Sequence, residues 1–127
     1  MPRDIAPTAI DRAVSAMATA APAIVAAALD DAVDRGARAI LDAANPGDKL
    51  RAALVGCSTT FCYPGLTVDR LADALLASIA GERRRLREGH WTASANRLTA
   101  LMQIERAMRD ERFPAAFARA VEIQGRA

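Results

Sequence analysis

With 127 residues, of which 52% are apolar, the chain is long enough for one domain that buries roughly two-thirds of its unfolded surface. Aromatic residues make up only 4% while alanine occurs 31 times, so we expect helices that form readily around a thin core, which favours self-association. The formal net charge of +2 does not by itself indicate nucleic-acid binding, and without an apolar run of 18 residues we expect no membrane span and no membrane partner.

The N-terminal region is predicted to be helical after a frayed start at residues 1–6. Asp4 and Asp11 interrupt any early apolar run, so the region does not resemble a signal peptide and a cytoplasmic location is expected. Pro7 suits the first turn of a helix, and Pro22 is expected either to kink that helix or to begin the next one. We predict one helical domain over residues 1–127.

Residues 23–44 carry apolar side chains at helical spacing. Asp34 and Arg38 are four residues apart in the order that favours an ion pair on a helix. Gly36 lies on the apolar face, where glycine costs about 1 kcal/mol relative to alanine. We therefore expect another helix to cross closely at Gly36.

The segment Asn45-Pro46-Gly47-Asp48 separates this helix from a short one ending near Gly56, with Asn45 as its N-cap and Pro46 at the first helical position. Residues 57–66 then form a loop or a short extended piece that holds both cysteines. Two cysteines and one histidine are too few for a structural zinc site, so we predict two reduced, partly buried thiols and no metal or other cofactor.

Residues 67–110 contain the dominant pattern, two amphipathic helices that should fold back on each other. Thr67 is the predicted N-cap of the first helix, Gly89-His90 the turn, and Thr92 the N-cap of the second, with Trp91 folded back over the turn. A last short helix begins at Pro114. The predicted fold is all-α, a compact bundle of about five helices whose longest element is the antiparallel hairpin at 67–110. Its apolar faces are expected to hold Val68, Leu71, Leu75, Ile79 and Leu86 on the first helix and Leu98, Leu101, Met102 and Met108 on the second.

Arginines concentrate near the end of the first hairpin helix. Adjacent residues on a helix are about 100° apart, so Arg83, Arg84 and Arg85 cannot all face one ligand. One interpretation is a solvated helix end beside the C-terminal dipole, and the other is a ridge that contacts phosphates. The candidate nucleic-acid-binding residues are Arg83, Arg84, Arg87 and Arg97.

The second set of candidates would form a protein interface. Glu105 interrupts the apolar face of the second hairpin helix and Arg83 that of the first, and their unequal distances from the turn prevent pairing within a simple hairpin. A polar residue on an apolar face can set the register of an oligomer. The candidate interface residues are Trp91, Leu98, Met102 and Glu105.

Three functions remain open, and the first is favoured. The chain is expected to be a non-enzymatic helical interaction or assembly protein, oligomeric or bound to a protein partner. The alternatives are a nucleic-acid-binding protein that uses the arginine-rich helix, and a small enzyme that uses the Cys57–Tyr63 loop with His90. No catalytic residue is assigned, because no motif of a nucleophile with its base is present. The hairpin resembles those of flagellar-type export chaperones and of the oligomerising segment of phage small terminases in periodicity.

Overall fold

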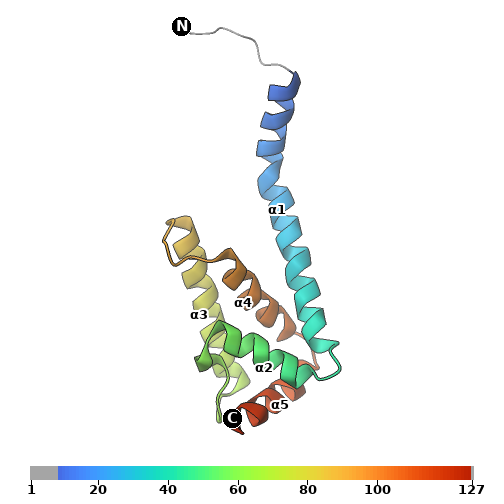
Figure 1. Ribbon diagram of the computed structural model, residues 1–127, viewed down its shortest axis with the longest axis vertical. Helices are drawn as coiled ribbons and strands as arrows, with labels where there is room; N and C mark the ends of the chain where they lie inside the picture. The colour runs from blue at the N-terminus through green and yellow to red at the C-terminus, as the bar shows by residue number, and fades with distance from the viewer. Residues whose placement is uncertain (1–8, 127) are drawn as a thin grey trace. The chain divides into compact units, whose positions relative to one another are not determined.

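The computed structural model describes the backbone of residues 9–126 and the side chains of residues 23–126 (Figure 1). Within residues 9–126 every regular element is a helix, which confirms the predicted all-α fold with five α-helices. They are α1 (Ala9–Leu41), α2 (Pro46–Cys57), α3 (Val68–Arg87), α4 (Ala95–Ala107) and α5 (Phe113–Gly125), with a 3₁₀ turn, η1, at Thr59–Phe61. The predicted frayed residues 1–6 lie outside the described part. The contacts divide the chain into two compact units, with the boundary between Asp31 and Ala32. The single domain over residues 1–127 stays a prediction.

Helix α1 corrects two predictions. It is 33 residues long, so the longest helix is α1 and not a helix of the hairpin. Its backbone is also helical on both sides of Pro22, so no second helix begins at Pro22 and one helix takes the place of the predicted boundary. A proline costs a helix interior about 3 kcal/mol, but nine alanines between residues 13 and 28 supply the highest helix propensity around it.

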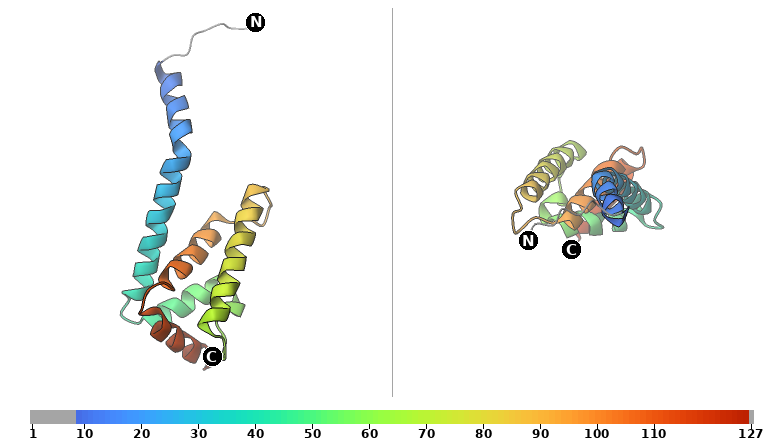
Figure 2. Two further views of the ribbon diagram at one scale, coloured as in Figure 1. Left: turned by 180° about the vertical axis from the view of Figure 1, so that it is seen from behind. Right: turned by 90° about the horizontal axis from the view of Figure 1, so that it is seen from above.

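The unit that begins at Ala32 has one hydrophobic core, to which all five helices contribute. Helix α2 packs against both α5 and α4, and α3 packs against α4 (Figures 1 and 2). Phe113 and Phe117 stack within α5 with ring centroids 5.8 Å apart. The fully buried large side chains that build the core are Val33, Leu50, Leu54, Leu71, Leu75, Leu101, Ile104 and Phe113.

Helices α3 and α4 form the predicted antiparallel hairpin (Figure 2). Thr67 caps α3 as predicted, because its hydroxyl accepts a hydrogen bond from the backbone N–H of Arg70 at 3.2 Å. The connection is longer than the predicted turn, however, and Ser94 rather than Thr92 caps α4 by accepting from the N–H of Arg97 at 3.1 Å. Trp91 is 89% exposed, so it does not pack over the turn as the predicted hydrophobic staple.

Two glycines mark close helix crossings, as predicted for Gly36. A Cβ atom on Gly36 would overlap the end of the Gln103 side chain from α4. A Cβ atom on Gly47, at the start of α2, would overlap the stem of Arg119 from α5. Pro46 occupies the first turn of α2 as predicted, whereas the side chain of Asn45 makes no capping hydrogen bond.

Candidate interaction surfaces

The buried charge of the hairpin is Glu82, and not Glu105 as the sequence pattern suggested. Glu82 is 1% exposed. One of its carboxylate oxygens lies 3.0 Å from Arg85 Nε and the other lies 3.6 Å from Arg97 Nε. It follows Leu75 by seven residues and Ile79 by three, so it continues the apolar face of α3. That spacing was the signal that could have identified it.

Glu105 lies at the side of α4 and has its own partner. Arg109, one turn later, places Nη2 2.8 Å from Oε1 of Glu105, and the glutamate side chain keeps 25% of its surface exposed. The pair neutralises the charge of Glu105 within α4, and the expected role of Glu105 in setting the register of an oligomer stays a prediction. Leu98 belongs to the core and is 8% exposed, so it offers little surface to a partner, and its place in an interface stays a prediction.

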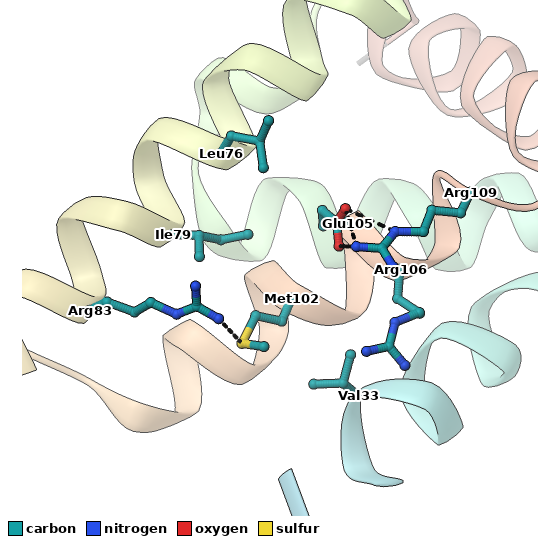
Figure 3. A pocket seen from close by; sticks show the side chains of 8 residues that line it. All are labelled: Val33, Leu76, Ile79, Arg83, Met102, Glu105, Arg106 and Arg109. Atoms are coloured by element: carbon teal, nitrogen blue, oxygen red, sulfur yellow. Dashed lines mark hydrogen bonds and ion pairs between the residues drawn. The ribbon is translucent and has the colours of Figure 1, made fainter. Parts of the chain in front are cut away.

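A groove of about 280 Å³ opens between α3, α4 and the last turns of α1, and brings several candidates together (Figure 3). Met102 lies in it, and Arg83 Nη2 contacts the Met102 sulfur at 3.9 Å. Arg83 and Glu105 both line this groove without an ion pair between them, although the sequence placed them far apart along the hairpin. The groove is lined by Val33, Leu76, Ile79, Arg83, Met102, Glu105, Arg106 and Arg109.

The predicted nucleic-acid residues fall into two groups. Arg97 belongs to the buried Glu82 cluster, as does Arg85. Arg83, Arg84 and Arg87 are exposed. Among the described residues none of these three makes an ion pair, and Arg83 makes its one side-chain contact with the Met102 sulfur.

The connection from α3 to α4 carries the most exposed of the large hydrophobic side chains in the described part of the chain. Helix α3 ends with Gly89 in the left-handed conformation, at φ 64°, and the N–H of His90 bonds the carbonyl oxygen of Arg85 at 2.9 Å. This six-residue closure is the Schellman motif that reverses the chain after a helix. Trp91 then stacks on the His90 ring, with centroids 5.9 Å apart and planes inclined by 23°.

A second exposed apolar surface lies on α1. Residues 23–29 read A-I-V-A-A-A-L without a polar side chain, and the first six are exposed. Ile24 and Val25 each keep 63% of their surface in solvent. A helix that is apolar on all sides is typically covered by another element or molecule.

The Cys57–Tyr63 loop does not form an activated nucleophile. Cys57 and Cys62 are both free and buried, and burial raises the pKa of each thiol, opposed by Arg97 at Cys57 and by Arg51 at Cys62. A raised pKa keeps a cysteine in the unreactive thiol form. The hydroxyl of Ser58 bonds Thr60 at 2.8 Å, and no histidine contacts it.

His90 is held by its own neighbours and not by the Cys57–Tyr63 loop. Its Nδ1 accepts a hydrogen bond from the N–H of Thr92 at 3.2 Å and lies 2.7 Å from the Thr92 hydroxyl. Among the residues that the structure describes there is no cluster of three or more potential metal ligands, and no helix there combines the length and hydropathy of a membrane span. No family model, curated protein or solved structure matches this chain.

Proposed function

We propose that this chain is a non-enzymatic helical interaction protein that associates with a second copy of itself through residues 23–29 of α1. The single observation that carries this proposal is the exposure of Ile24 and Val25 within seven consecutive apolar residues. Burial of apolar surface contributes about 25 cal/mol per Å², so such a segment gains stability when another apolar surface covers it.

A second copy is the partner that fits the chemistry of this segment. Residues 23–29 carry no charge and no hydrogen-bonding side chain, so the segment has no polar pattern that would select a foreign partner. An uncharged apolar face is complementary to itself, as a two-fold symmetric interface requires. Four of its seven residues are alanine, and small side chains allow two helices to approach closely.

Sedimentation velocity between about 1 and 100 µM tests the proposal. The wild-type chain is expected to change from monomer to dimer over this range, and the double variant Ile24→Glu/Val25→Glu is expected to stay monomeric with an unchanged circular dichroism spectrum. The control is Tyr63→Glu, which adds a charge at an exposed apolar side chain outside α1 and should dimerise like the wild type. A wild-type monomer at every concentration would overturn the proposal.

A further inference from the structure

Positive charge is concentrated at the end of the α3–α4 hairpin. Residues 82–97 contain five arginines against two glutamates, whereas the whole chain has a formal charge of only +2. The low total therefore conceals a local basic surface, and the rest of the chain is slightly acidic. A local surface of this kind can attract an anionic partner even when the net charge is small.

Three of the five arginines at this end have no acidic partner among the described residues. Several exposed arginines elsewhere are neutralised within the chain, including Arg38 by Asp34, Arg112 by Asp42 and Arg126 by Glu122. Arg83, Arg84 and Arg87 make no ion pair among the described residues. Three adjacent, unneutralised cations repel one another, and an external anion would relieve that repulsion.

Helical geometry places these three arginines on one face. At about 100° per residue, Arg87 lies roughly 40° and Arg84 roughly 100° around the axis from Arg83. Arg85 lies about 200° from Arg83, on the side where its guanidinium meets Glu82. The arginine that leaves this face is thus the one used inside the fold, and the three that share it remain available for a ligand.

An aromatic platform follows directly after this face. The reversal at Gly89 brings His90 and Trp91 immediately beyond the last turn of α3, and the two bonds from Thr92 to Nδ1 of His90 fix the imidazole ring. The indole of Trp91 stacks on that ring and still exposes 89% of its surface. A supported and solvent-exposed indole can accept a second flat ring.

We propose that this hairpin end binds single-stranded nucleic acid, with Trp91 stacking on a base and Arg83, Arg84 and Arg87 contacting phosphates. Stacking on an aromatic side chain combined with a basic track is the common mode of sequence-tolerant single-strand binding. A duplex keeps its bases stacked inside and offers no free base to the indole. A membrane surface would favour several apolar side chains around the tryptophan, but its neighbours are His90 and Thr92.

Because Trp91 is the only tryptophan in the chain, its fluorescence reports on this site directly. We would titrate the full chain with 15-nucleotide oligo(dT) and oligo(U) in 50 mM salt, and expect quenching together with an anisotropy change of the labelled strand. For a single strand, three phosphate contacts predict that the logarithm of the binding constant falls with the logarithm of the salt concentration with a slope of about −2. This salt slope corresponds to roughly a 20-fold loss of affinity between 50 and 200 mM salt. A blunt 15-base-pair duplex should bind more weakly than the single strands.

Variants separate this site from general charge attraction. Trp91→Ala should weaken binding about 5- to 150-fold without changing the salt dependence, as expected for the loss of one stacked base. Arg84→Gln/Arg87→Gln should weaken binding and also reduce the slope by more than one. The matched control is Arg119→Gln/Arg126→Gln, in α5 and at its C-cap, where both arginines pair with Glu122, and it should bind like the wild type.

The proposal is overturned if neither oligonucleotide binds at 50 mM salt, or if the Trp91 and arginine variants bind as tightly as the wild type. It is also overturned if vesicles containing 30% phosphatidylserine, or poly-glutamate, bind more tightly than the single strands. Self-association through α1 does not involve these residues, so Ile24→Glu/Val25→Glu should still quench with oligo(dT). That variant distinguishes failure of this site from failure of the proposed dimer.

Discussion

Arg97 of α4 reaches Glu82 of α3 across the hairpin, with its Nε 3.6 Å from a carboxylate that is 1% exposed. Arg85 holds the other carboxylate oxygen at 3.0 Å from within α3. The carboxylate is therefore neutralised from both helices, while both guanidinium groups keep contact with water. This arrangement links the two helices near the connection between α3 and α4, next to the exposed arginines.

Removing both arginines should therefore cost more stability than removing the glutamate. Arg85→Gln/Arg97→Gln leaves a buried carboxylate without a cation, which destabilises by up to about 3–5 kcal/mol. In Glu82→Gln the two arginines are partly exposed and can be solvated, so we expect a loss of about 1 kcal/mol. Urea unfolding followed by circular dichroism measures both. Arg109→Gln, which breaks only the exposed pair with Glu105, should change the stability by about 0.5 kcal/mol or less. Equal losses in the two Glu82-cluster variants would contradict this assignment.

The close crossing at Gly36 predicts energetic coupling with Gln103. Gly36→Ala gains about 1 kcal/mol of helix propensity, but it displaces the Gln103 amide, which donates to the carbonyl oxygen of Ala32 at 3.2 Å. We expect the two effects nearly to cancel in the wild type. With Gln103→Ala in place the obstruction is gone, so Gly36→Ala should become stabilising by about 1 kcal/mol. A double-mutant cycle with no coupling would show that α1 and α4 are not in contact there.

The amino-acid pattern predicted the elements that depend on local chemistry. The all-α class, the antiparallel hairpin and the Thr67 cap follow from helical periodicity and capping residues, and the structure confirms them. It left open whether one helix continues through Pro22 or a second begins there, because the effect of Pro22 depends on how much helix propensity surrounds it. The pattern also predicted a turn of only two residues, Gly89 and His90. In the structure the Schellman closure at Gly89 is followed by a longer connection that ends at Ser94.

The candidate site was only partly predictable for a different reason. Helical periodicity assigns a position to the apolar or the polar face of a helix, but it does not identify the partner of a polar side chain. Glu82 and Glu105 both carry a carboxylate near an apolar face, and only the packing of α4 decides that Glu82 is buried beside Arg97. Leu98 and Trp91 were both interface candidates, and the structure buries the first and exposes the second.

The contrast between Leu98 and Trp91 gives a direct test of this difference in burial. Leu98→Ala removes a buried side chain and should destabilise the fold by about 2–5 kcal/mol. Trp91→Ala removes a larger side chain that is 89% exposed, so its effect should be within about 0.5 kcal/mol. Urea unfolding measures both values, from the shift of the midpoint when the dependence of the unfolding free energy on urea concentration is unchanged. A loss of more than about 2 kcal/mol in Trp91→Ala would mean that the indole packs against the protein.

Burial of Cys57 and Cys62 predicts slow alkylation and a defined pH dependence of stability. Burial raises the pKa of both thiols in the folded chain, so at pH 8 iodoacetamide should modify them more slowly than in urea-unfolded protein. A pKa raised on folding stabilises the fold below the unfolded thiol pKa of about 8.5, and this contribution is lost as the pH rises through the folded pKa. The stability difference between wild type and Cys57→Ala/Cys62→Ala should therefore be constant from pH 6 to 8 and shrink by pH 10. A difference that stays constant up to pH 10, or alkylation as fast as in the unfolded chain, would mean that the thiols are open to solvent.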